Sequence, residues 1–188
     1  MAVPGSLRVL ILPGINSSGP KHWQTFWEKA HPEFRRVPER DWEHPVRREW
    51  VEALEAAVRE SGPKTVLVAH SLACLQVAHW AAETRLTVQS ALLVAPPDPK
   101  RKAFPKVAIG FAPVPKKRLG FPSLLVASSN DPYATLAFSQ GLAKAWGSRL
   151  VSFGPQGHLN SESDLRDWPR GFRLLQVLMK EGSFSSHD

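Results

Sequence analysis

The chain has 188 residues, of which 43% are hydrophobic and 22% charged, proportions typical of a folded globular protein. Its single cysteine excludes an intramolecular disulfide and any metal site built from several cysteines. The net charge of +7 comes from scattered basic residues that form no recognisable binding module, so we expect no nucleic-acid partner.

Length and hydropathy predict the broad organisation. A chain of this size is expected to fold as a single domain over residues 1–188. No apolar segment near the N-terminus resembles a signal peptide, and no apolar run approaches the ~18 residues of a membrane span. We therefore expect a cytoplasmic protein with no membrane partner.

In the first part of the chain, short apolar runs alternate with helical patterns. Residues 7–12 form a near-continuous apolar run, typical of a parallel strand buried on both faces, and a turn-rich loop follows at 13–19. Pro20 opens a predicted helix to about residue 30, where apolar residues recur at helical spacing. A short strand at 34–38 and a helix at 45–60 come next.

A buried strand followed at once by an apolar helix frames the residue on which we place the chemistry. Residues 66–69 are all apolar or small, and the helix runs from 72 to about 83. Ser71 lies at the turn between them, the setting of a nucleophile elbow. The usual pattern has glycine two residues before and after the serine, and here Ala69 and Ala73 take those places.

An irregular segment then interrupts the alternation. It spans residues 96–122, follows a predicted strand at 90–95, and is rich in proline and basic residues without any periodicity. Long irregular segments in compact domains are often functional, so we expect this one to border the site. Its apolar side chains are expected to cover a pocket: Phe104, Val107, Ile109, Phe111 and Val114.

The remaining pattern completes the fold prediction. Strands are expected at 123–128 and 149–153, helices at 134–146 and 165–180, and a flexible tail at 182–188. About six strands alternate with helices, which predicts an α/β fold with a doubly wound, mostly parallel sheet and helices on both faces. Ligands of such sheets bind at the carboxyl ends of the strands.

Three residues with complementary chemistry follow predicted strands. A serine nucleophile needs a base, and the base needs a partner that fixes its tautomer. Ser71, Asp131 and His158 occur in the α/β-hydrolase order of nucleophile, acid and histidine. We therefore assign His158 as the base and Asp131 as the acid that orients it, with Asp98 as the alternative acid.

A hydrolase also needs backbone donors for the developing oxyanion. The Leu72 N–H, directly after the nucleophile, is expected to supply one, and the Ile15 N–H the other, with Asn16 as its alternative. His70 is expected to point away from the nucleophile, and Cys74 to be a small core residue.

Several short motifs together resemble the bacterial branch of the retinoblastoma-binding-protein-like small serine hydrolases, in the α/β-hydrolase superfamily. The resemblance spans nearly the whole chain and implies a compact α/β-hydrolase core with a minimal cap, no cofactor, and a triad on Ser71, Asp131 and His158. The motifs are Leu12-Pro13-Gly14 with His22-Trp23, Ala69-His70-Ser71-Leu72-Ala73, Leu93-Val94-Ala95-Pro96, Val126-Ala127-Ser128 with Asp131-Pro132-Tyr133, Ala145-Trp146-Gly147, and Gly157-His158-Leu159-Asn160 with Trp168-Pro169.

We therefore expect a serine hydrolase that cleaves small carboxylic esters, or amides, through an acyl-enzyme on Ser71. The alternative is a non-catalytic interaction protein on the same scaffold, which would bind partners through residues 96–122. The complete triad favours the enzyme. Retinoblastoma binding in the family uses a Leu-x-Cys-x-Glu segment, and the corresponding residues 72–76 end in Gln76, so this partner is not expected.

Overall fold

Six parallel strands form one sheet in the computed structural model, which describes residues 6–181. The predicted tail at 182–188 lies outside the described residues. The strand order is β2-β1-β3-β4-β5-β6, and every neighbouring pair runs parallel. The strands are β1 (Arg8–Leu12), β2 (Arg35–Arg36), β3 (Thr65–His70), β4 (Ser90–Val94), β5 (Ser123–Ala127) and β6 (Arg149–Ser152).

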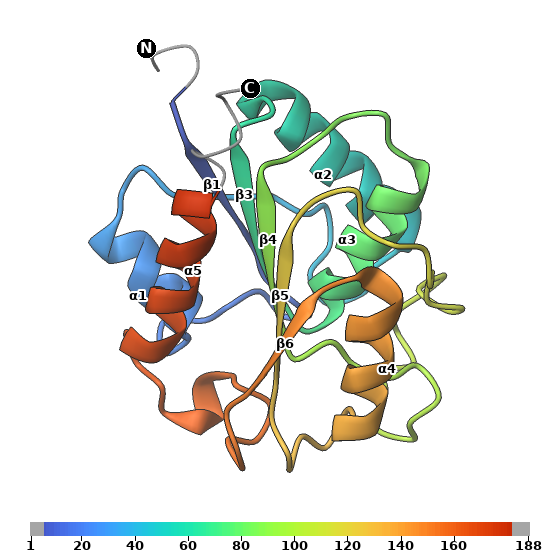
Figure 1. Ribbon diagram of the computed structural model, residues 1–188. Coiled ribbons are helices and arrows are strands. Elements are labelled where there is room, and N and C mark those ends of the chain that lie inside the picture. Colours follow the sequence, from blue (N-terminus) through green and yellow to red (C-terminus); the bar gives the residue numbers. More distant parts are fainter. Residues whose placement is uncertain (1–5, 182–188) are drawn as a thin grey trace.

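Helices cover both faces of this sheet, which confirms the predicted doubly wound α/β architecture. Figure 1 shows α1 and α5 on one side and α2, α3 and α4 on the other. Within residues 6–181, no helix is both long enough and apolar enough to cross a membrane. The helices are α1 (Trp23–Ala30), α2 (Arg47–Ser61), α3 (Leu72–Glu83), α4 (Leu136–Trp146) and α5 (Pro169–Glu181), with a short 3₁₀ turn at Ser161–Ser163.

The central strands lack polar alternation because each contributes to a core on both sides. In β3, Leu67 and Ala69 pack into the cluster shared with α2, α3 and α4, whereas Val66 and Val68 pack into the cluster shared with α1 and α5. Side chains of a strand alternate between faces, so two cores require an unbroken apolar run.

The winding of the chain reverses between β1 and β3. β1 has β2 on one side and β3 on the other, with Leu12 paired to Ala69 at the carboxyl ends. The chain therefore leaves these two adjacent strands at a topological switch point, where open α/β sheets bind their ligands. The loop after β1 and the turn that holds Ser71 meet there.

Four helices, α1, α2, α4 and α5, begin later than their patterns predict, and residues at their N-termini explain three of these differences. His22 caps α1, because its Nδ1 accepts the Gln24 N–H at 3.2 Å. Thr135 caps α4 by accepting the Phe138 N–H at 3.1 Å. α5 begins at Pro169, whose ring suits the first turn of a helix, so residues 165–168 are not helical.

The segment at 96–122 contains neither helix nor strand, as predicted, apart from a single bridge from Ile109 to Val46. Two of its apolar residues, Phe111 and Ile109, do not cover a pocket as we expected. Phe111 is 0% exposed, with its ring 5.7 Å from Trp50 and 6.4 Å from His79. Phe111 thus anchors the segment to the core, while Ile109 is 61% exposed.

Gln76 of α3 and Glu39 form a polar pair that links the protonation of Glu39 to the stability of the fold. Gln76 donates from Nε2 to Glu39 Oε1 at 2.8 Å, while Glu39 Oε2 and Gln76 Oε1 are both buried without a partner. Burial raises the pKa of Glu39 to about 8. A protonated Glu39 is neutral and gains a donor, whereas the carboxylate would be a buried charge with acceptors only.

This arrangement predicts a loss of stability as pH rises. Between the ordinary pKa of 4.5 and about 8, the folded state keeps a proton on Glu39 that the unfolded chain has lost. The free energy of unfolding should therefore fall over this range, by at most about 1.4 kcal/mol per pH unit. Glu39→Gln keeps a donor and an acceptor on the side chain but does not titrate. The free energy of unfolding of this variant, measured in urea, should therefore rise relative to that of wild type as pH increases.

The exposed Glu52→Gln on α2 is the matched control, since Glu52 is 68% exposed and outside this pair. A stability difference for Glu39→Gln that stays constant with pH would contradict the assignment.

Candidate active site

Ser71 occupies a strained turn between β3 and α3. Its backbone has φ 56° and ψ −124°, a region that costs a non-glycine residue about 1–3 kcal/mol. The Ser71 N–H donates to the Val94 carbonyl at 2.8 Å, which ties the turn to β4. Ala69 and Ala73 are both 0% exposed, so the positions two residues on either side have no room for larger side chains. This is the conformation expected of a nucleophile elbow.

The loop after β1 lies directly against this turn at Gly14. A Cβ on Gly14 would stand 3.0 Å from Ser71 Cβ and 3.2 Å from the His70 carbonyl oxygen. Only glycine permits such an approach without displacing the backbone of the turn. The contact sets the distance between the serine and the amides of residues 15 and 16.

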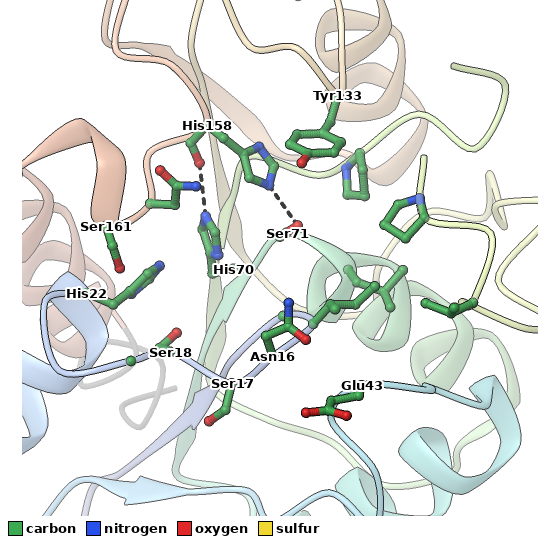
Figure 2. A pocket seen from close by; sticks show the side chains of 18 residues that line it. Asn16, Ser17, Ser18, His22, Glu43, His70, Ser71, Tyr133, His158 and Ser161 are labelled. Atoms are coloured by element: carbon green, nitrogen blue, oxygen red, sulfur yellow. Dashed lines mark hydrogen bonds between the residues drawn. The ribbon is translucent and has the colours of Figure 1, made fainter. Parts of the chain in front are cut away.

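A continuous hydrogen-bonded chain joins Ser71, His158 and Asp131. The Ser71 hydroxyl donates to His158 Nε2 at 2.8 Å, as Figure 2 shows. His158 Nδ1 donates to both carboxylate oxygens of Asp131, at 3.0 and 2.9 Å. His158 and Asp131 are both buried, at 8% and 7% exposure. The structure therefore brings together the three residues predicted to act in concert.

Asp98, the alternative acid, lies outside this chain of hydrogen bonds. Its carboxylate accepts the Lys100 N–H at 2.9 Å, and it makes no hydrogen bond to His158 among the described residues. Asp131 instead accepts hydrogen bonds from the Tyr133 N–H and from the imidazole, so its carboxylate is held by two groups.

Side chains just before Asp131 hold the loop that carries His158. Asn130 Oδ1 accepts the Gly157 N–H at 2.7 Å, and Ser128 Oγ accepts the Gln156 N–H at 2.9 Å. Neither contact was predicted from the sequence. Their only signal was proximity to Asp131, because the pairing arises where the loops after β5 and β6 meet.

His70 faces the site, contrary to the expectation that it points away. Its Nε2 donates to the His158 carbonyl at 3.0 Å, and its ring lies 4.7 Å from that of His22 (Figure 2). Burial lowers the pKa of His70 well below its usual 6.5 and, with the nearby Arg36 charge, that of His22 to about 3. Both rings are therefore neutral at physiological pH.

The amides proposed for the oxyanion differ in their availability. The Asn16 N–H already donates to the Trp42 carbonyl at 2.8 Å. The Ile15 and Leu72 N–H groups have no acceptor among residues 6–181, and both residues line the cavity beside Ser71. The free donors are thus those of Leu72 and Ile15.

A cavity of about 450 Å³ opens at Ser71, and its lining includes both polar and apolar side chains (Figure 2). Figure 2 shows the side chains of His22, His70 and Ser161 on one side of Ser71, which we call the polar half of the cavity. The apolar part of the lining includes Pro97, Pro105 and Val107, so the segment at 96–122 borders the site as predicted. Neither Phe104 nor Phe111 lines it.

Cys74 is a core residue, in agreement with its predicted role. It is 0% exposed, and its Sγ lies 3.3 Å from the Val94 carbonyl. Burial raises the pKa of this thiol, which disfavours the thiolate needed for nucleophilic attack.

Comparisons with known proteins place the chain in a family and a fold. The sequence profile described as serine hydrolase matches residues 9–177. A protein described as a ydeN-like hydrolase, from Pectobacterium atrosepticum, is 28% identical, with a TM-score of 0.85 over 94% of this chain and 92% of that one. A search of curated proteins gives no match.

Two further solved structures share the fold. The ydeN gene product of B. subtilis is 18% identical, with a TM-score of 0.78 over 92% of this chain and 98% of its own. A thermophilic esterase from Thermogutta terrifontis is 15% identical, with a TM-score of 0.68 over 94% and 90%. At these identities the similarity establishes a common α/β-hydrolase architecture.

The contact between Gly14 and the turn predicts a selective effect of a single methyl group. Gly14→Ala should slow labelling of the protein by a fluorophosphonate probe roughly tenfold or more, since displacement of reacting groups by a fraction of an ångström is costly. Gly19→Ala in the same loop is the matched control, because its Cβ would meet no atom within 4 Å. Equal labelling rates in the two variants would show that the contact does not set the geometry.

Proposed function

The chain belongs to the serine hydrolase family, and from that premise we propose that it hydrolyses small carboxylic esters through an acyl-enzyme on Ser71. The observation that carries the proposal is the unbroken chain from the Ser71 hydroxyl through His158 to Asp131, with links of 2.8 and 2.9 Å. A serine so paired can lose its proton as it attacks a carbonyl carbon.

The proposed reaction has two halves. In the first, Ser71 Oγ bonds to the substrate carbonyl carbon while His158 Nε2 takes the hydroxyl proton. The oxyanion of the tetrahedral intermediate accepts hydrogen bonds from the Leu72 and Ile15 N–H groups. The intermediate then expels the alcohol, which receives its proton from His158. In the second half, water attacks the acyl-enzyme by the same route and releases the acid.

Asp131 serves the reaction by fixing the proton of His158. Its carboxylate holds the Nδ1–H tautomer, which leaves Nε2 unprotonated toward Ser71. The imidazolium that forms during attack is stabilised by this buried negative charge. Amide substrates could use the same groups, but we propose esters because their alcohols are the better leaving groups.

We also propose that the chain falls within the retinoblastoma-binding-protein-like branch, among its bacterial members. The stretch that corresponds to the Leu-x-Cys-x-Glu segment supports no partner binding here. Its residues from Leu72 to Gln76 lie in α3 at no more than 1% exposure. A small-molecule ester is therefore the proposed partner of this site.

Removal of the nucleophile tests the proposal directly. Ser71→Ala should lower kcat for p-nitrophenyl esters by roughly 10⁴-fold or more and abolish fluorophosphonate labelling, the scale of other triad deletions. Cys74→Ala, the control for the nearby thiol, should retain both. Full labelling or turnover in folded Ser71→Ala would refute the proposal.

The two candidate acids form a matched pair for the same assay. Asp131→Asn should be severely impaired, because the amide disturbs the tautomer of His158, whereas Asp98→Asn should keep most of its activity. The opposite pattern would transfer the orienting role to Asp98.

A further inference from the structure

Two neutral histidines in the polar half of the cavity have no part in the proposed acyl transfer. His22 caps α1 and His70 ends β3, and their ring centroids are 4.7 Å apart at an angle of 66°. They are 4% and 5% exposed, and both line the cavity beside Ser71. Their hydrogen bonds define which ring nitrogen of each carries the proton.

His22 presents a donor that lacks an acceptor. Its Nδ1 accepts the Gln24 N–H at 3.2 Å, so the proton of the neutral ring is on Nε2. That Nε2 is buried and has no hydrogen-bond partner. An unpaired buried donor carries a free-energy cost that a suitable ligand would relieve.

His70 presents the complementary acceptor. Its Nε2 donates to the His158 carbonyl at 3.0 Å, so Nδ1 is unprotonated. No described residue donates to this Nδ1, which lies on the cavity side of the ring in Figure 2. The half of the cavity nearest Ser71 therefore holds one free donor and one free acceptor on adjacent rings.

The charges around the pair favour a neutral ligand group. The nearest cation, Arg36, is engaged by Glu28, Ser17 and Thr25. The Glu43 side chain, an acid, also lines the cavity, which disfavours an anionic ligand. A carboxylate or phosphate would in addition meet the lone pair of His70 Nδ1, whereas a hydroxyl matches both nitrogens.

We propose that His22 and His70 bind a hydroxyl group of the substrate, which accepts from His22 Nε2–H and donates to His70 Nδ1. The inference rests on the proposed ester hydrolysis and deepens it: the substrate is an ester of a polyhydroxy alcohol, of which a second hydroxyl occupies this subsite. An alkyl group there would leave both nitrogens unpaired.

We assign the alcohol of the ester to the polar half of the cavity because His158, the proton donor, lies beside it. His158 Nε2 delivers a proton to the leaving oxygen, and the His158 ring lies 5.1 Å from the ring of His70. The departing alcohol thus leaves beside the polar groups. The half lined by Pro97, Pro105 and Val107 remains for the acyl chain.

Two substitutions remove the ligand-binding atoms and keep the structural hydrogen bonds. His22→Asn places an oxygen where Nδ1 accepts the Gln24 N–H, and asparagine is a good helix cap, but the Nε2–H is lost. His70→Gln places an N–H where Nε2 donates to the His158 carbonyl, but the acceptor Nδ1 is lost. The exposed His44→Gln, whose side chain is 68% exposed, is the control.

The experiment compares glycerol monoacetate with propyl acetate, which differ in the hydroxyls of the alcohol, by titration of released acid. Wild type and His44→Gln should prefer the glycerol ester. The ratio of kcat/KM for the two should fall about tenfold in His22→Asn and in His70→Gln, the scale of one buried hydrogen bond. Loss of fold would lower both rates together and leave the ratio unchanged.

Other outcomes separate this inference from the proposed function. No preference for the glycerol ester in wild type, or an unchanged ratio in both folded variants, would overturn the hydroxyl subsite while ester turnover still stands. A variant-sensitive preference for propyl glycolate over propyl acetate, with none for the glycerol ester, would also overturn it, because the hydroxyl would then belong to the acyl group. Absence of Ser71-dependent turnover with every ester would refute the proposed function itself.

Discussion

The contact between the loop after β1 and the turn at Ser71 is the constraint on which the site depends. The turn is strained, with φ 56° at a serine, and the backbone bond to Val94 on one side and Gly14 on the other hold it. Because β1 and β3 are adjacent at the switch point, this contact also places the Ile15 amide beside the nucleophile. The sheet topology thus brings Ser71 and the Ile15 amide together from two neighbouring strand ends.

The position of His158 follows from the next pair of strands. β6 lies beside β5, so the loop after β6 meets the loop after β5, where Asn130 and Asp131 reach its backbone and its imidazole. His70 also donates a hydrogen bond to the His158 carbonyl. Since these bonds come from different elements, the imidazole keeps its orientation without any contribution from a cap domain.

The features predicted from the sequence are those encoded locally. Apolar runs marked the buried strands, and the small residues beside Ser71 marked the turn. Local sequence could not distinguish Asp98 from Asp131, because both residues follow strands. The pairing of β5 with β6 brings Asp131 within hydrogen-bond distance of His158. The roles of His22 and His70 escaped prediction for the same reason: the partner of His70 lies 88 residues away, and a tautomer depends on its partner. We expected Phe111 to cover a pocket, but it is buried in the core. Both positions favour a large apolar residue, so the sequence does not separate them.

Mass spectrometry of protein quenched during the hydrolysis of p-nitrophenyl butyrate tests the central claim most directly. The account predicts a single butyryl group on the peptide that contains Ser71, formed with the first release of p-nitrophenol and lost when the substrate is exhausted. A butyryl group on another residue that forms and decays at the rate of turnover would contradict it.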